Sequence, residues 1–280
     1  MKLIPSFLMF VPLMLVGCGE DKPPASVTEV APAPAAAKMP SKVNPADLEK
    51  TTRKVTLVPS PVEMQRELQS LGVDKDLKDF ITGVKVNATS ENKDQVAVAT
   101  GVVIADVLFT VLHSDDATLV AQLSQVKAGL GALKGGKDIA AYVDGMIEQV
   151  KAGAGDRKTL LDEMDELSAV AIPELEFEGE ASIVPMIQAG SWMEGVHLIA
   201  KASLAAGKPQ VCDQMLKQPM IVEYFKEYTA QKGEDDGNAV IQHLSASLAK
   251  LEAIAAKTDP MTESDVSEIT SLTGALLGIL

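Results

Sequence analysis

The chain has 280 residues and a net charge of −14. Hydrophobic residues make up 46% of the chain, and aromatic residues make up only 4% of it. The acidic balance excludes nucleic acid as an expected partner, because phosphate binding needs a basic face. It also disfavours docking on anionic lipid. A composition dominated by alanine, leucine and valine favours packed helices over a β-sandwich.

The N-terminus has the pattern of a secretory signal. Lys2 precedes an apolar run over residues 3–16, which is shorter than the roughly 20 residues of a membrane span. The run ends in Leu15-Val16-Gly17-Cys18, which resembles the lipobox of bacterial lipoproteins. The resemblance implies that residues 1–17 are a cleaved signal peptide and that Cys18 carries lipid, so that the membrane is a partner through acyl chains. An ordinary signal peptide or a transmembrane anchor is the alternative.

The residue after the cysteine bears on localisation. Gly19 stands there instead of an aspartate, and for a lipoprotein this implies the outer membrane, with the domain facing the periplasm. Residues 18–45 are rich in proline and alanine and predict a disordered tether of extended conformers. Residues 46–280 are expected to form one all-helical domain.

Apolar residues recur at helical spacing through this domain, which predicts an all-α fold, a single bundle of about nine or ten helices. Ser114-Asp115-Asp116 and Thr262-Glu263-Ser264-Asp265 are typical helix starts. Pro173 and residues 174–178 interrupt the helical pattern. Their alternation is compatible with a strand, but we expect a loop or a lone turn between two helices. The predicted helices cover residues 62–71, 75–84, 92–112, 114–133, 139–150, 160–167, 182–206, 221–231, 240–255 and 262–276.

The most apolar segment, residues 92–112, has two interpretations. A membrane span is one, but the segment is slightly short and contains Asp106. We therefore predict a helix that is buried on all sides within the bundle.

Polar residues and glycines within two apolar helices mark the candidate site. Asp106 and Glu194 lie in helices predicted to be buried, where a carboxylate costs several kcal/mol unless it is paired. Gly101 and Gly190 each cost about 1 kcal/mol relative to alanine in a helix. Close helix–helix approach would offset that cost, so we expect the two segments to cross.

These segments are similar to ones in uncharacterised all-helical bacterial lipoproteins. The first is led by Gly101 and ends in Ala105-Asp106, and the second is Gly190-Ser191-Trp192-Met193-Glu194-Gly195. Val103 and Ser191 stand where an aromatic residue and a glycine are expected. The resemblance implies a shared fold and no assigned activity.

Three interpretations of the cluster of Asp106, Trp192, Glu194 and His197 remain open. The acids can satisfy neighbouring donors and fix the helix register, or the cluster can line a ligand pocket between helices. A metal site is the third, because Glu194 and His197 share one helical face, although the second Glu-x-x-His of a di-iron bundle does not occur.

The sequence predicts a lipid-anchored envelope protein that acts as a non-enzymatic binding or scaffold module, for an unidentified envelope protein or small ligand. No cofactor and no catalytic motif is expected. The alternative is a metal- or carboxylate-dependent enzyme that uses Glu194, His197 and Asp106. Cys212, the one cysteine besides Cys18, is predicted to be a buried small hydrophobe.

Overall fold

The computed structural model describes residues 60–134, 137–154, 156–178, 183–232 and 238–280. These residues form ten α-helices and one short 3₁₀ turn, with no strand among them, which confirms the predicted all-α fold. They belong to one contact unit, Asn44–Leu280. The predicted signal peptide, the tether and Cys18 lie outside the described residues.

The first described helix, α2 (Pro61–Leu71), is bounded by strong local signals. A capping box closes its start: the Ser60 hydroxyl accepts from the Glu63 amide, and the Glu63 carboxylate accepts from the Ser60 amide. Gly72, with φ of 68°, ends the helix in the left-handed conformation that favours glycine.

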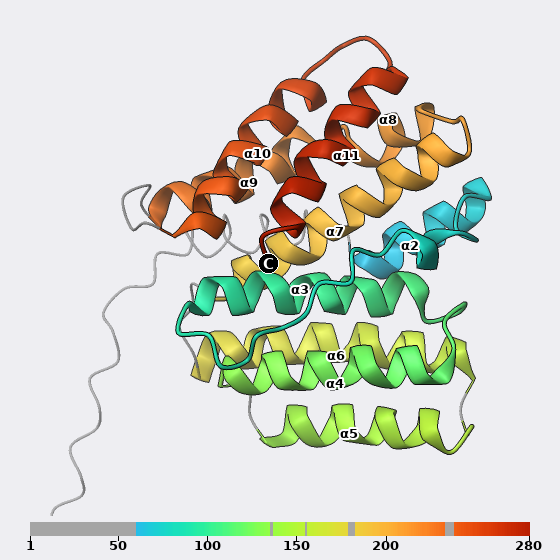
Figure 1. Ribbon diagram of the computed structural model, residues 1–280, viewed down its shortest axis with the longest axis vertical. Coiled ribbons are helices and arrows are strands. Elements are labelled where there is room, and N and C mark those ends of the chain that lie inside the picture. Colours follow the sequence, from blue (N-terminus) through green and yellow to red (C-terminus); the bar gives the residue numbers. More distant parts are fainter. Residues whose placement is uncertain (1–59, 135–136, 155, 179–182, 233–237) are drawn as a thin grey trace, which may run out of the picture. The chain divides into compact units, whose positions relative to one another are not determined.

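The prediction of a helix over residues 75–84 is wrong. A single 3₁₀ turn, η1 (Leu77–Asp79), forms there instead. Gly83 adopts a φ of 68°, which a continuing helix does not allow. The residues from Ile81 to Asn92, here called the strap, run without helix towards the start of α3 (Figure 1).

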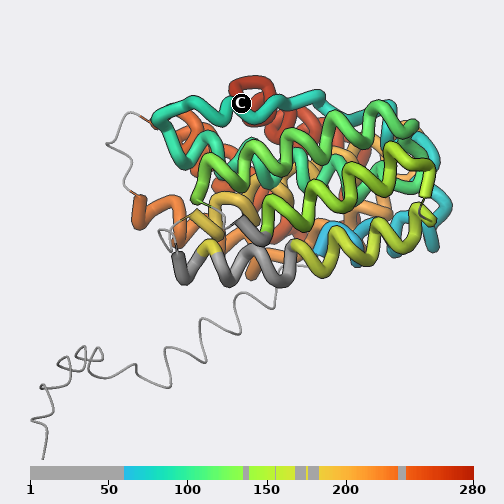
Figure 2. The backbone as a smooth tube through the Cα atoms, turned by 90° about the horizontal axis from the view of Figure 1, so that it is seen from below, coloured from blue at the N-terminus to red at the C-terminus, as the bar shows by residue number. Residues whose placement is uncertain are grey.

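Helix α3 (Lys93–Thr110) is enclosed, as predicted. Every residue from Val96 to Thr110 is buried. Beyond α3, α4 (Asp116–Ala132), α5 (Lys137–Lys151) and α6 (Arg157–Glu178) lie side by side (Figures 1 and 2). In the part of the chain that the structure describes, no helix combines the length and the apolarity that crossing a bilayer requires.

The prediction of a loop at Pro173 is also wrong, because α6 continues through this residue to Glu178. A proline inside a helix removes one hydrogen bond and costs about 3 kcal/mol. Leu175, two residues further on, is 1% exposed and belongs to the core. Burial of this side chain offsets part of the cost and holds the last turns of α6 in place.

Helix α7 (Ile183–Ala205) joins the two sides of the bundle. It packs on α3 on one side and on α11 (Glu263–Leu277) on the other (Figure 1). Three helices lie between α7 and α11 in the sequence: α8 (Gln210–Leu216), α9 (Pro219–Gln231) and α10 (Ala239–Ala255). Helix α10 packs on both α9 and α11. The residues on α7 are therefore positioned to meet partners from both sides.

Candidate functional site

The site is built around the crossing of α3 and α7, where two glycines bring the backbones into contact. A Cβ atom at Gly101 would lie 1.9 Å from the Ile187 carbonyl oxygen, and one at Gly190 would lie 2.1 Å from the Val98 carbonyl oxygen. No side chain fits at such distances, so glycine is required at both positions. The predicted crossing is therefore confirmed, and it brings Asp106 of α3 next to Glu194 of α7.

Asp106 and Glu194 form a carboxyl pair in the protein interior. Asp106 is 2% exposed and Glu194 is fully buried. Their side chains are hydrogen-bond partners, yet Asp106 Oδ1 and Glu194 Oε1 meet no donor group of the protein. Because ionised carboxylates only accept hydrogen bonds, a bond between them needs a proton on one of the two groups. The two carboxyl groups therefore hydrogen-bond to each other only while at least one of them is protonated.

Burial accounts for the proton affinity of this pair. It raises the pKa of Asp106 to about 7, against the opposing effect of the hydrogen bond with Glu194. Burial also raises the pKa of Glu194 well above its ordinary value, and the neighbouring Asp106 raises it further. The backbone of Thr82 in the strap and, to a smaller extent, Lys201, half-buried two turns along α7, act in the opposite direction and lower the pKa of Glu194. The two carboxyl groups titrate as a pair.

The strap covers Glu194 from the solvent side. The Thr82 hydroxyl lies 3.5 Å from Glu194 Oε2, which is long for a hydrogen bond between oxygens. Thr82 itself is exposed. The carboxyl pair is thus one residue layer below the surface, and the sequence contains no local signal that places Thr82 there.

His197 lies on the same helical face but bonds to α11. Its Nδ1 is 2.8 Å from Thr273 Oγ1. The Thr273 hydroxyl donates its one proton to the Ile269 carbonyl oxygen at 2.9 Å, so it accepts from His197 Nδ1–H. His197 Nε2 is then unprotonated, and it has no hydrogen-bond partner. Burial, aided by the positive charge of Lys201, lowers the pKa of His197 to about 4.

Trp192 occupies a different, apolar environment. Its ring packs against Phe225 of α9, with centroids 5.6 Å apart and planes tilted by 41°. It also lines a small crevice of about 10 Å³, whose other lining residues are Val196, Leu216, Val222, Leu251, Ile254, Ala255, Met261 and Ile269. A crevice of this size has room for about one water molecule and none for a ligand.

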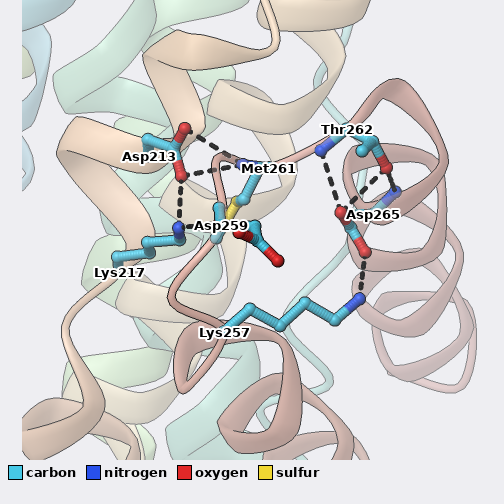
Figure 3. Close-up of polar contacts among 7 residues, drawn as sticks. All are labelled: Asp213, Lys217, Lys257, Asp259, Met261, Thr262 and Asp265. Carbon is cyan, nitrogen blue, oxygen red and sulfur yellow. Dashed lines mark hydrogen bonds and ion pairs between the residues drawn. The ribbon is translucent and has the colours of Figure 1, made fainter.

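The loop between α10 and α11 is held over this crevice by charged groups (Figure 3). Both carboxylate oxygens of Asp213 accept from the Met261 amide, at 2.9 and 3.0 Å. Lys217 pairs with Asp213 at 2.8 Å, and Lys257 pairs with Asp265, the acid of the capping box that starts α11. These contacts fix Met261, which is 4% exposed, against the core.

The four residues of the predicted cluster therefore do not converge on one pocket. Asp106 and Glu194 form the pair, His197 is bonded to Thr273, and Trp192 packs on Phe225. Among the described residues, no group of three or more His, Cys, Asp and Glu side chains is placed to hold a metal ion. Lys201 was missed by the sequence analysis, although its position seven residues after Glu194 places it on the same helical face.

Cys212 is buried, as the sequence predicts, and it carries a free thiol. Burial raises the pKa of this thiol to about 11. The thiolate is the reactive form of cysteine, so the side chain is unreactive at neutral pH. Cys212 therefore behaves as a small core residue of α8.

An open groove lies on the surface between α10 and α11. It encloses about 330 Å³, and its lining mixes charged, polar and small apolar side chains. The lining residues are His243, Ala246, Ser247, Lys250, Glu268, Ser271, Leu272 and Ala275. The volume is in the range of small-molecule sites, and the sequence analysis did not single out this surface.

Comparison with known proteins identifies no relative. No protein-family model matches the chain, and no curated protein and no solved structure is significantly similar to it.

Proposed function

We propose that this protein is a lipid-anchored, non-enzymatic binding module of a bacterial cell envelope, tethered through Cys18 and facing the periplasm at the outer membrane. The observation that carries the non-enzymatic part is the enclosure of the Asp106–Glu194 pair. Its two carboxyl groups, at 2% and 0% exposure, bond to each other. A pair closed in this way holds α3 against α7 and offers no approach to a substrate.

The groove between α10 and α11 is the proposed contact surface. It is open to solvent and brings Lys250 and His243 of one helix close to Glu268 of the other. Such a lining recognises a small polar ligand or a polar segment of an envelope protein through charge-assisted hydrogen bonds. The net charge of −14 keeps the module soluble and is consistent with this role.

The anchor is tested by replacing Cys18 with serine in the native host. We expect the wild-type protein to fractionate with membranes and to show an intact mass with the first 17 residues removed and fatty acyl groups added. The Cys18→Ser variant should lose both properties. A variant that still fractionates with membranes would contradict the anchor.

The contact surface is tested by cross-linking and co-purification of the lipidated protein. Ala246→Trp places a large side chain in the groove, whereas Ala141→Trp places the same side chain on the exposed surface of α5. We expect Ala246→Trp to lose the captured partner and Ala141→Trp to keep it. Equal capture by the two variants would exclude the groove as the contact surface.

A further inference from the structure

The groove between α10 and α11 is floored by short side chains that leave room for another helix. The two helices run in opposite directions and pack on each other (Figure 1). Ala246 and Ser247 line the groove from α10, and Ser271 and Ala275 line it from α11. Packed helices have axes about 8–10 Å apart, and short side chains at the contact allow the closer approach. The floor therefore suits a helix as the occupant, but it does not specify which one.

Two oppositely charged side chains stand at one end of the groove. The Ser247 hydroxyl donates to the Leu272 carbonyl oxygen at 3.4 Å, which shows the level at which the two helices meet. Lys250 comes three residues after Ser247, and Glu268 comes four residues before Leu272. Because the helices are antiparallel, Lys250 and Glu268 lie at nearly the same level. Both side chains are exposed and line the groove.

Neither Lys250 nor Glu268 belongs to an ion pair in the part of the chain that the structure describes. Glu268 is within electrostatic reach of Lys257, but the ion pair of Lys257 is with Asp265. The groove therefore offers one positive and one negative group to its occupant, at fixed positions on opposite rims.

A second copy of the chain supplies both counter-charges at once. When one copy is turned by half a revolution about an axis along the groove, its α10 lies over α11 of the other copy. Lys250 of each copy then meets Glu268 of the other, because the two residues share one level. His243, at the other end of the groove, meets the small Ala275, so no like charges face each other there. The contact is isologous, and the four helices form a bundle with antiparallel neighbours.

We propose that the occupant of the groove is a second copy of this chain, docked groove to groove about this two-fold axis. The dimer rests on the proposed function, because it uses the same contact surface. Each copy completes the groove of the other, since Glu268 of one becomes the counter-ion of Lys250 of the other. The net charge of −14 repels two copies in general, so association needs a surface on which opposite charges are matched.

The test is the self-association of the full chain, purified from cells in a mild detergent and followed by sedimentation over a range of concentrations. We expect the wild type to form dimers. Lys250→Glu and Glu268→Lys each turn both charge contacts from attraction to repulsion, so each should raise the dissociation constant by about tenfold or more. A wild-type chain that is monomeric at every concentration would overturn the proposal.

Two comparisons separate the matched contact from the net charge. Lys158→Glu reverses an exposed charge of α6 and changes the net charge as Lys250→Glu does, so it should alter the dissociation constant by less than about twofold. Glu268→Lys makes the chain less negative, so net charge alone would strengthen association. Stronger association of Glu268→Lys would therefore contradict the proposed contact.

An equimolar mixture of the Lys250→Glu and Glu268→Lys variants tests the pairing between copies. In a mixed dimer, residue 250 of each variant faces an opposite charge at residue 268 of the other. We therefore expect mixed dimers to form with about the affinity of the wild type, although each variant alone is mostly monomeric. If the mixture stays as monomeric as its components, the two-fold contact is excluded.

Ala246→Trp distinguishes failure of the dimer from failure of the proposed contact surface. It should abolish the dimer, and Ala141→Trp on α5 should keep it. If the wild type is monomeric and Ala246→Trp still loses a different captured protein, the groove remains a contact surface, but its occupant is not a second copy. A dimer that Ala246→Trp leaves intact uses another surface and would also overturn the proposal.

Discussion

Gly190 of α7 lies directly against the backbone carbonyl of Val98 of α3, where a Cβ atom would be 2.1 Å from the oxygen. The obstacle is backbone, which cannot rotate away as a side chain can. We therefore expect Gly190→Ala to push the two helices apart and to lower the free energy of unfolding by about 3 kcal/mol or more. Urea denaturation measures this loss.

Gly145 of α5 is the matched control, because a Cβ atom there would meet nothing within 4 Å. Gly145→Ala should stabilise the protein by up to about 1 kcal/mol through helix propensity. If the two substitutions have similar effects, the close approach of α3 and α7 does not determine stability.

The carboxyl pair predicts a stability that falls as the pH rises. The pKa values of Asp106 and Glu194 are raised in the folded protein, so the folded state holds more protons than the unfolded state above about pH 4. Stability is therefore lost as the pH rises through the folded pKa, which is about 7 for Asp106. The slope is at most about 1.4 kcal/mol per pH unit for each group.

Asp106→Asn, measured beside the wild type by urea denaturation from about pH 5 to about pH 8, isolates this contribution. The asparagine retains the shape of Asp106 and donates a hydrogen bond to Glu194 without a shared proton. The variant should gain stability relative to the wild type as the pH rises. A difference in unfolding free energy that stays constant with pH would exclude the proton-sharing pair.

For His197 we expect a stability that falls as the pH is lowered, which is the opposite dependence to that of the carboxyl pair. Its pKa is lowered to about 4 in the folded protein, so the unfolded state binds a proton first as the pH falls below about 6.5. The contribution of His197 to stability is therefore complete above about pH 6.5 and decreases towards pH 4.

The His197→Asn variant keeps a donor near Thr273 but cannot be protonated. Its stability relative to the wild type should rise by up to about 1.4 kcal/mol per pH unit between about pH 6.5 and about pH 4. The difference measured at about pH 8, where the histidine is neutral in both states, is the baseline. No change from that baseline on acidification would show that His197 is accessible to protons in the folded state.

Asp213 connects α8 to the α10–α11 loop, so we expect its replacement to lower the stability of the protein (Figure 3). Removal of its carboxylate leaves the Met261 amide without its partner and Lys217 without its counter-ion. We expect Asp213→Ala to cost about 1–3 kcal/mol. Asp144→Ala breaks the exposed Lys127–Asp144 pair and should cost less than about 1 kcal/mol. Thermal unfolding of the two variants distinguishes the contributions, and equal losses would contradict a special role for Asp213.

Much of the fold could be predicted from the sequence, because helix signals are local. The apolar segment over residues 92–112 predicted the enclosed helix α3, and the glycines at 101 and 190 predicted its crossing with α7. The sequence left the partner of each buried acid open, so the contact between Asp106 and Glu194 was not among the predictions. These inferences depend on periodicity and on the cost of glycine and charge inside a helix.

The remaining features depend on contacts between distant parts of the chain. Thr82 meets Glu194 across 112 positions, and His197 meets Thr273 across 76, so no spacing rule connects them. The continuation of α6 through Pro173 likewise depends on a tertiary contact, the burial of Leu175. The predicted helix over residues 75–84 failed because Gly83 takes a left-handed conformation at the start of the strap.

The contact between α3 and α7 also has a consequence for biogenesis. Gly101 and its contact residue Ile187 are 86 positions apart, so the ribosome adds α4, α5 and α6 before the partner of α3 exists. At usual elongation rates the delay is on the order of ten seconds. Among the described helices that are synthesised before α7, the most hydrophobic one, α3, is thus the one that waits for its partner. Translation that stops before α7 should yield an aggregating fragment, and a factor that shields α3 in the interval would raise the yield.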